Sequence, residues 1–411
     1  MSQRRARVLY VEKPVAVGGS VISLLELVRG LDTDRYEPVV LFFGPNPYRE
    51  RFTTLGVGIL VLGQMQPANA SQVKSRRDIA ASLSRYNHNL ADAYRAAKDV
   101  YLLVRRDMRQ ARQLARLIRR EAIDLVHHNN GLSGSRDGVL AARMVGVPQV
   151  CHIRMLHPPS PVERRLARWV DAFIYISTAV ERLYCDHGIP AAKGRVVHNP
   201  IAVDKFGRAD GVNGLRTELG LAANDRVISN IGRLDWWKGH EVFLSAMAQV
   251  VQAEPAAKAL IVGEADDTPM NRAYAEALHQ MVSDLQLSDR VVFAGYRVDI
   301  PRIMKISDVV VHSASRPEPF GRVIGEAMAA GRPVVASAAG GVLDIVDHGV
   351  NGLLVSPGDT ASMANAILRI LRNDELARTL AQRGQERART CFSVEQHVSG
   401  VQSVYQGLLA A

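Results

Sequence analysis

Short apolar runs rich in β-branched residues recur along this chain, and helix-like patterns separate them. Such alternation predicts parallel βαβ units, because parallel strands are buried on both faces and helices connect them. In the first half, strands are expected over residues 7–11, 38–43, 58–62, 125–128, 149–153, 173–176 and 196–197. A second series is expected over residues 227–231, 259–262, 291–293, 309–311, 334–336 and 353–355.

The two series of strands predict an α/β protein with two domains. A chain of 411 residues is too long for one ordinary core and suits two domains of roughly 200 residues each. We predict a Rossmann-like N-terminal domain over residues 1–203, a second doubly wound domain over 204–390, and a final helix over 391–411 that crosses back. Ligands bind outside the carboxyl ends of such strands, so two facing domains predict a cleft.

One segment, at about residues 71–121, departs from this pattern and indicates a basic helical insertion in the N-terminal domain. Over residues 95–120, apolar positions recur at helical spacing. Six arginines lie largely around the other faces: Arg105, Arg106, Arg109, Arg112, Arg116 and Arg119. Two interpretations stay open. The helix either packs on the sheet with a solvated face, or docks on anionic lipid, which attracts basic amphipathic helices.

Composition and charge limit the expected cellular location of the protein and the kinds of partner it binds. The net charge of +10 favours acidic partners, whether phosphorylated metabolites, anionic lipid or nucleic acid. The N-terminus lacks the pattern of a signal peptide, and no run of about 18 apolar residues predicts a membrane span. We therefore expect a cytoplasmic protein, with a peripheral position at the inner face of the cell membrane as an alternative. The three cysteines lie far apart and are expected to be reduced and buried.

Residues 308–341 carry the most informative pattern, a strand, loop, helix and strand in succession. Glu318 lies in the loop, which ends at Phe320 and Gly321, and Glu326 lies on the helix. A helix N-terminus offers free N–H groups, so we expect a phosphate at Gly321. Eight residues of helix would span about 12 Å, whereas carboxylates that act on one glycosidic bond lie roughly 5 to 9.5 Å apart. The two glutamates are therefore expected to hold different groups, the sugar and the ribose of a nucleotide sugar.

Two isolated glutamates would ordinarily be surface residues, but the residues around this pair are specific. The segment EPFGRVIGEAMAAGRPVVAS resembles the E-x7-E signature of retaining glycosyltransferase family 4, whose members have the two-domain GT-B fold. The segment NIGRLDWWKGHEVFLSAM is similar to the GR-x4-KG segment of that family, which implies that Arg233 and Lys238 bind the donor diphosphate. Shorter matches follow at residues 262–264, 293–296, 340–346 and 351–355. The resemblance therefore covers nearly all of the C-terminal half.

The resemblance also implies further donor-binding positions. These are Gly295, Tyr296, Phe320, Gly321, Arg322 and Val323. The first two are expected to approach the nucleobase, and the backbone of the last two the phosphate. Arg322 departs from the family pattern, in which many members carry an apolar residue. This departure leaves the donor open among UDP-, GDP- and ADP-linked sugars.

Three features of the N-terminal half and the hinge have two explanations each. Gly18, Gly19 and Ser20 follow the first strand, where a GG turn is often only a tight connection. The resemblance implies that this loop faces the donor phosphate or the acceptor, which we favour. His152 ends a strand where the family carries a histidine near the reacting sugar, but a histidine among apolar residues is equally expected to be a core group. Asn199 matches a polar hinge position of the family, or forms a turn.

The resemblance implies a retaining glycosyltransferase that moves a sugar to a glycan or polyprenyl-linked acceptor, in cell-surface polysaccharide or glycolipid synthesis. Arg233 and Lys238 would neutralise the leaving diphosphate, so neither a cofactor nor a metal is expected. The DxD-like string at residues 32–34 lies at the wrong ends of the strands to bind a catalytic metal. An anionic membrane is a further candidate partner, and nucleic acid is not expected.

Other functions of the same fold remain alternatives at this stage. A GT-B-fold sugar-nucleotide epimerase would need its own acid pair around the sugar, and a glucan phosphorylase would bind free phosphate. A non-enzymatic two-lobed protein would close on its ligand and release nothing. Release of nucleotide only in the presence of an acceptor separates transfer from all three.

Overall fold

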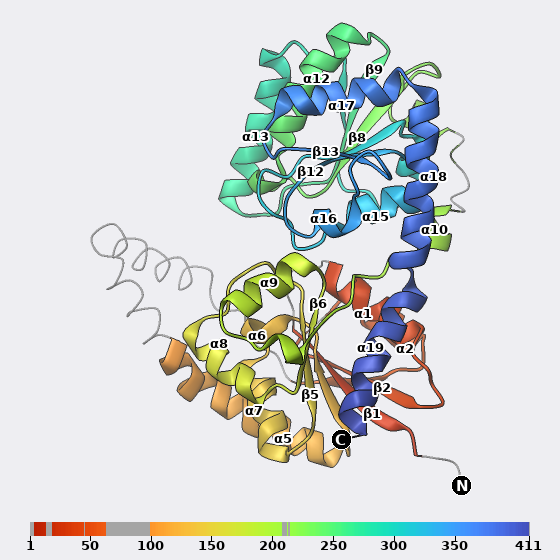
Figure 1. Cartoon of the computed structure of the whole chain (residues 1–411). Coiled ribbons are helices and arrows are strands. Elements are labelled where there is room, and N and C mark those ends of the chain that lie inside the picture. The colour runs from red at the N-terminus through yellow and green to blue at the C-terminus, as the bar shows by residue number, and fades with distance from the viewer. Residues whose placement is uncertain are drawn as a thin grey trace. The chain divides into compact units, whose positions relative to one another are not determined.

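The structure is a computed structural model that describes residues 4–13, 19–44, 46–62, 99–207, 212 and 214–410. The chain divides into two compact units (Figure 1). Unit 1 comprises Met1–Val197 with Val398–Ala411, and unit 2 comprises His198–His397. The sequence placed the boundary after residue 203. Among the described residues, no helix is long and apolar enough to span a membrane.

Unit 1 is built on a seven-stranded parallel sheet in the order β3-β2-β1-β4-β5-β6-β7. Its strands are β1 (Ala6–Glu12), β2 (Tyr36–Phe42), β3 (Gly58–Val61), β4 (Leu125–His128), β5 (Gln149–Ile153), β6 (Ala172–Tyr175) and β7 (Gly194–Val196). The predicted strands of the first half are confirmed. The strand order reverses between β1 and β4, and such a reversal leaves room for a ligand at the carboxyl ends.

The helices of unit 1 connect these strands. They are α1 (Gly19–Arg29), α2 (Arg49–Thr53), η1 (Leu103–Asp107), α5 (Met108–Arg120), α6 (Gly131–Gly134), α7 (Arg136–Val145), α8 (Pro161–Leu166), η2 (Ala167–Trp169), α9 (Thr178–Asp186) and η3 (Ala191–Lys193). Helix α19 (Val394–Leu409) begins in unit 2, and from Val398 it belongs to unit 1. There Tyr405 is buried and contacts the Tyr36 ring at 5.6 Å.

The basic helix is confirmed over its described part, from residue 99 onward. Its second half packs against the unit, because Ala111, Ala115 and Ile118 are buried on one face. Val100 and Val104, at the same helical spacing, are 51% and 63% exposed. The apolar stripe therefore meets the core only along α5.

Unit 2 is built on a six-stranded parallel sheet in the order β10-β9-β8-β11-β12-β13. Its strands are β8 (Arg226–Ile231), β9 (Ala257–Val262), β10 (Val291–Phe293), β11 (Val309–His312), β12 (Val334–Ser337) and β13 (Leu353–Val355). Its other elements are α10 (Val203–Gly207), α11 (Leu215–Glu218), η4 (Trp236–Lys238), α12 (His240–Ala253), α13 (Pro269–Asp284), α14 (Ile300–Ile306), α15 (Arg322–Ala329), α16 (Val342–Ile345), α17 (Thr360–Leu371) and α18 (Asp374–Cys391). The predicted strands of the second half are confirmed.

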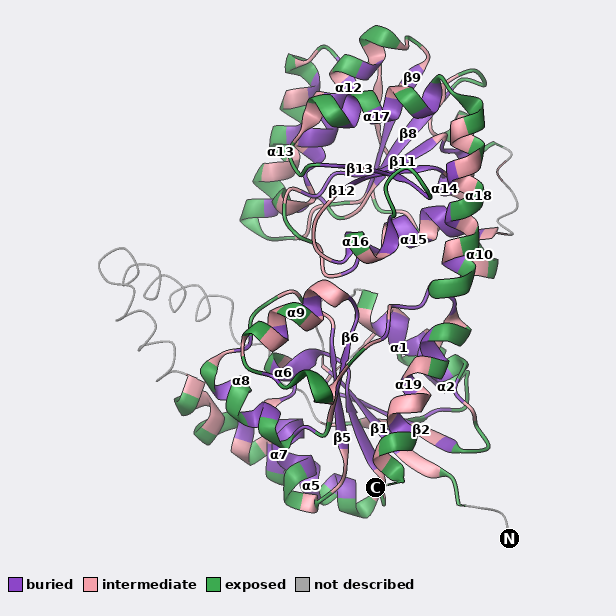
Figure 2. Ribbon diagram, in the orientation of Figure 1, coloured by how far each residue is buried: buried purple, intermediate pink, exposed green. Residues whose placement is uncertain are grey.

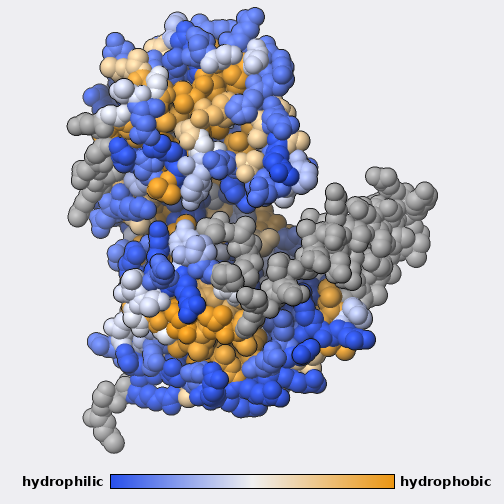
Figure 3. Space-filling view, turned by 180° about the vertical axis from the view of Figure 1, so that it is seen from behind, coloured by the Kyte–Doolittle hydropathy of each residue, from blue (hydrophilic) through white to orange (hydrophobic). Residues whose placement is uncertain are grey.

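Successive residues of the unit 2 strands pack into different cores, as a doubly wound sheet requires. Ile228 and Ile261 pack in a core with the buried faces of α12, α13 and α17. Their neighbours Val227 and Leu260 pack in a second core with α11 and α14. Figure 2 shows the buried strands between helices whose outer faces are exposed. On the face shown in Figure 3, hydrophilic residues surround areas of apolar residues within each unit.

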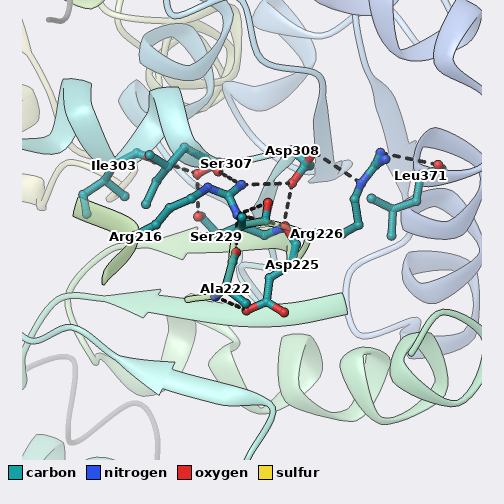
Figure 4. A network of polar contacts seen from close by, with 12 residues as sticks. Arg216, Ala222, Asp225, Arg226, Ser229, Ile303, Ser307, Asp308 and Leu371 are labelled. Carbon is teal, nitrogen blue, oxygen red and sulfur yellow. Dashed lines mark hydrogen bonds and ion pairs between the residues drawn. The ribbon is translucent and has the colours of Figure 1, made fainter. Parts of the chain in front are cut away.

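A polar network joins the amino ends of β8 and β11, the two central strands of unit 2 (Figure 4). The Asp308 carboxylate accepts a hydrogen bond from the Val227 N–H at 2.7 Å. It also lies 3.3 Å from Arg226 and 4.0 Å from Arg216. The hydroxyl of Ser229 on β8 also lies 2.6 Å from that of Ser307, which follows α14 and precedes β11. These contacts set the two strands side by side, and the carboxyl ends of the same pair carry the candidate site.

The cysteine prediction is partly wrong. All three cysteines are free, but only Cys151 is buried, while Cys185 is half-buried and Cys391 is exposed. Cys391 is the last residue of α18, an amphipathic helix whose outer face meets solvent. Cys391 is exposed because it lies on the outer face of α18. The rotation of the packed helix determines which residues lie on that face.

We expect Asp308→Ala to lower the free energy of unfolding by about 1 to 3 kcal/mol, because it removes a charged partner of the Val227 N–H. Asp289→Ala is the matched control, since the Asp289 side chain is 77% exposed and, among the described residues, pairs only with Arg290 at 3.5 Å. That change should cost less than about 0.5 kcal/mol. Chemical denaturation measures both, and equal losses would contradict a structural role for the network.

Candidate active site

The candidate site lies at the carboxyl ends of β8 and β11, where the strand order of unit 2 reverses. Parallel sheets bind ligands at such a switch point, because the connecting loops turn away in opposite directions there. The loop after β8 carries Arg233 and Lys238, and the loop after β11 carries Glu318. Two separate sequence motifs therefore meet at one edge of one sheet.

Glu318 is held by two cationic or hydrogen-bonding neighbours. Lys238 Nζ lies 2.8 Å from one carboxylate oxygen of Glu318 and 2.9 Å from the other. His312, the last residue of β11, lies with Nε2 at 2.8 Å from Glu318 Oε2. Both side chains are largely buried, as is Glu318 itself. The two predicted site residues Lys238 and Glu318 thus form one cluster, and His312 completes it.

The charge state of Glu318 follows from these contacts. Burial alone would raise the pKa of its carboxyl group, but the charge of Lys238 and the hydrogen bond from His312 outweigh burial. The net effect holds the pKa of Glu318 well below its usual range. An ionised carboxylate can only accept hydrogen bonds, so His312 donates from Nε2. At neutral pH the same carboxylate is suited to accept hydrogen bonds from sugar hydroxyls.

Glu326 has a different partner. Arg322 Nη2 lies 3.2 Å from Glu326 Oε1, one helical turn along α15, and Arg322 Nη1 donates to the carbonyl oxygen of Pro200 at 2.9 Å. Burial raises the pKa of Glu326, and the Arg322 ion pair opposes this rise. Arg322, which is expected to depart from the family pattern, therefore provides a cation for Glu326.

Arg233 is the most exposed charged group of the site. Its side chain is 54% exposed, and Nη2 lies 2.7 Å from Asp235 Oδ2. Asp235 is buried and also accepts a hydrogen bond from Asn271 at 2.6 Å. Asp235 thus orients one side of the guanidinium and leaves the other side available to an anion.

Glycines bring the loops of the site together. Gly340 has φ of +66°, and a Cβ there would lie 2.2 Å from the carbonyl oxygen of Glu318. Gly239 has φ of +68°, and its Cβ would lie 2.1 Å from the carbonyl oxygen of Ser313. A side chain at either position would push the loops apart, because contacts this short do not occur. The Glu318 backbone is therefore placed by Gly340, and the backbone next to Lys238 by its packing on residues 313–315.

The comparisons agree with this geometry. The family model described as Glycosyl transferases group 1 matches residues 213–387, and the model described as Glycosyltransferase Family 4 matches residues 17–205. Together they span most of both units. The chain belongs to the family 4 glycosyltransferases.

Relatives of known name support this assignment. An N-acetyl-alpha-D-glucosaminyl L-malate synthase of Bacillus anthracis is 26% identical over 314 residues, which are 74% of this chain and 80% of the relative. A UDP-Gal:alpha-D-GlcNAc-diphosphoundecaprenol alpha-1,3-galactosyltransferase of Escherichia coli is 26% identical over 316 residues, covering 73% and 79%. The crystal structure of Anabaena HepE with UDP-glucose is similar with a TM-score of 0.77 and 27% identity, over 98% of this chain and all of that one. The GT-B fold of this glycosyltransferase is thereby established.

The loop expected near the nucleobase follows β10 in this glycosyltransferase. Gly295 has φ of +64°, and the N–H of Tyr296 donates to Glu264 Oε1 at 3.0 Å. The Tyr296 side chain is 66% exposed. Its contact with a base stays a prediction, but the side chain is accessible to one.

Phe320 contributes packing to the donor loop. It is 1% exposed, and its ring lies 5.7 Å from the ring of His198 and 5.8 Å from that of Phe392. This aromatic cluster anchors the turn before Gly321, which has φ of +99° and precedes α15. Asn199, next to His198, is buried. Val323 lies in the first turn of α15 and is half-buried.

The predicted residues of unit 1 lie in two places. Gly18 lies outside the described residues, while Gly19 and Ser20 open α1. His152 is buried on β5, with Nδ1 3.3 Å from His127 Nε2. His127 in turn contacts the Tyr405 hydroxyl at 2.5 Å. A role for His152 at the donor sugar stays a prediction, and what is observed is a buried polar network.

Sequence reasoning missed three residues of the site. His312 directly follows the strand predicted over residues 309–311, and no motif marks it. Asp235 is two residues from Arg233, and this short spacing could have predicted an ion pair between them. Gly340 belongs to a segment noted for its resemblance, but its contact with Glu318 depends on two loops that are not adjacent in sequence. Among the described residues, no group of three or more His, Cys, Asp and Glu side chains is arranged to hold a metal ion.

We expect Gly340→Ala to reduce glycosyl transfer at least tenfold and to destabilise unit 2, because the new Cβ displaces the Glu318 backbone. Gly349→Ala is the matched control. Gly349 has φ of +76°, but a Cβ at this position would have no atom within 4 Å. The substitution should therefore lower the free energy of unfolding only by the backbone strain, about 1 kcal/mol. Thermal unfolding and a nucleotide-release assay measure the pair. If both variants kept full transfer, the role of Gly340 in placing Glu318 would be wrong.

Proposed function

We propose that this glycosyltransferase transfers a sugar from a UDP-sugar to a glycan or lipid-linked acceptor, with retention of configuration and without a metal ion. The observation that carries the proposal is the cluster of Lys238, His312 and Glu318, with Arg233 nearby in sequence on the same loop as Lys238. Such a cluster provides a fixed carboxylate for a sugar and cations for a diphosphate. The UDP-glucose complex of HepE supports UDP as the nucleotide.

The cations Arg233 and Lys238 would stabilise the leaving diphosphate. A unit charge at about 4 Å contributes at most about 4 kcal/mol at an effective dielectric near 20. Both cations already pair with carboxylates, so the net gain is smaller than this ceiling. Even half of it from each cation would total about 4 kcal/mol, which is about a thousandfold in rate.

Glu318 would bind the transferred sugar and would not act as a proton donor. Its depressed pKa keeps the group ionised at neutral pH. Both of its oxygens already accept hydrogen bonds, which lowers its strength as a nucleophile. We therefore favour a front-face route, in which an oxygen of the departing phosphate accepts the proton of the acceptor hydroxyl while the sugar leaves and is captured on the same face.

Glu326 would accept hydrogen bonds from the ribose hydroxyls. Arg322 holds the carboxylate in place through the ion pair and is itself bound to the Pro200 carbonyl. The ribose and the transferred sugar lie at opposite ends of the diphosphate in a nucleotide sugar. Separate partners for Glu326 and Glu318 fit this division of roles.

For the acceptor, we favour a group presented at a membrane surface. The name of the E. coli relative specifies a diphosphoundecaprenol-linked acceptor, and that of the B. anthracis relative specifies malate. The exposed arginines of the basic helix would favour the membrane-bound class, because anionic lipid attracts them. They include Arg105, Arg106, Arg109, Arg112 and Arg116.

Lys238→Ala should reduce nucleotide release roughly a hundredfold to a thousandfold, because a cation beside the leaving group is lost. Glu326→Ala should mainly weaken donor binding, by about 10-fold or more, since one charged hydrogen bond contributes about 1.5 to 3 kcal/mol. Kinetics with a UDP-sugar panel and acceptors separate the two effects. The controls are Lys258→Ala, at a half-buried lysine that donates to the backbone carbonyl of Asp289, and Glu276→Ala, at an exposed glutamate. Both should change neither quantity. Near-normal kinetics in both site variants would refute the assignment. Nucleotide release without acceptor would favour the epimerase alternative, and no nucleotide release with any acceptor would favour the phosphorylase or binding-protein alternatives.

Metal independence has its own test. We expect EDTA to leave nucleotide release unchanged, because the protein supplies the positive charge through Arg233 and Lys238. The measurement is the initial rate with and without the chelator, at a fixed ionic strength. A clear loss of rate that manganese restores would show that a metal ion is required.

A further inference from the structure

A concave site in unit 1 has no part in the function proposed above. It is a pocket of about 690 Å³ lined by five basic side chains: Arg164, Arg165, Arg168, His187 and Lys193. We call it the basic pocket. The first three side chains come from α8 and η2, which lead into the amino end of β6. The other two come from the segment that leads into the amino end of β7. The basic pocket is therefore formed by segments that enter the sheet, whereas ligand sites of such sheets lie at the carboxyl ends.

The positive charges of the basic pocket are not compensated by the described part of the protein. None of its lining residues is acidic. The side chains of Arg164, Arg165 and Arg168 form no hydrogen bond or ion pair with any described residue. Lys193 donates only to neutral carbonyl oxygens, at 3.2 Å to Arg168 and 2.7 Å to Val170.

The one acidic residue of α8 is engaged elsewhere. Glu163 lies 2.9 Å from Arg136 and accepts a hydrogen bond from the N–H of Ser160 at 3.0 Å. Arg164 and Arg168 are four residues apart, a spacing at which like charges on a helix repel by a few tenths of a kcal/mol. A hollow lined by one sign of charge also concentrates the field. An anion bound in the pocket would relieve this repulsion. Arginines that were only solvated would have no need to line a hollow.

We propose that the basic pocket binds a phosphate-bearing ligand at a site separate from the donor site of unit 2. Guanidinium groups present two parallel N–H donors that match phosphate oxygens, and three arginines with one lysine suit a ligand of more than one negative charge. The volume is in the range of small-molecule sites. The ligand is either a soluble phosphate ester or the headgroup of a phospholipid, and both share this chemistry.

The test measures binding of inorganic pyrophosphate by calorimetry in the Arg233→Ala/Lys238→Ala background, which removes the two donor-site cations. Arg164→Ser/Arg168→Ser in this background should weaken binding at least tenfold. The control is Arg143→Ser/Arg182→Ser, which removes the same charge from exposed arginines of unit 1 that do not line the pocket. It should weaken binding less than threefold. A parallel arm measures co-sedimentation with vesicles of phosphatidylglycerol and phosphatidylcholine, with phosphatidylcholine vesicles as reference.

The two arms identify the source of the phosphate. Selective loss of pyrophosphate binding in Arg164→Ser/Arg168→Ser supports a soluble ligand, and selective loss of vesicle binding supports a lipid headgroup. Equal behaviour of the two double variants in both arms would overturn the proposal. Neither outcome depends on the donor-site proposal, because the background already lacks Arg233 and Lys238. Unchanged thermal unfolding of both double variants confirms that the fold is intact.

Discussion

The ion pair between Lys238 and Glu318 is the interaction on which the candidate site depends. A largely buried carboxylate without a partner would be protonated or would disrupt the fold, so Glu318 can occupy this position only because Lys238 and His312 neutralise and bind it. Lys238 in turn can reach Glu318 only because Gly239 allows its loop to pack directly on the backbone after β11. The pair therefore links two motifs that are 80 residues apart in sequence.

The same arrangement explains how the protein can hold a charge-rich site before its substrate arrives. Each of the two glutamates has a basic partner, Lys238 for Glu318 and Arg322 for Glu326. Arg233 likewise pairs with Asp235. Under the proposed roles, a nucleotide sugar would bring hydroxyl groups for the acids and a diphosphate for Arg233 and Lys238. Binding would then exchange internal ion pairs for contacts with the ligand, so the cations need little reorganisation before the bond breaks.

In unit 1, by contrast, several cations have no acidic partner among the described residues. The arginines of the basic pocket have no acidic partner in the described part of the chain, whereas Arg136, next to the same helix, is bound by Asp99 and Glu163. Paired cations hold the fold together, and unpaired cations that converge on a hollow remain available for a ligand. The distinction rests on where each side chain points, since Glu163 and Arg164 are neighbours in sequence.

The sequence by itself determined the strands of both sheets and the two-unit α/β fold, and it marked Lys238 and Glu318 as candidate residues of one donor site. These follow from hydrophobic periodicity and from local motifs, which act over short stretches of chain. Only the tertiary structure decided that His312 binds Glu318, that Gly340 places its backbone, that Arg322 serves Glu326, and that Cys391 is exposed. Each of these depends on the distance between loops or on the rotation of a packed helix. Such quantities are set by the packing of the whole unit, and no local pattern of residues encodes them.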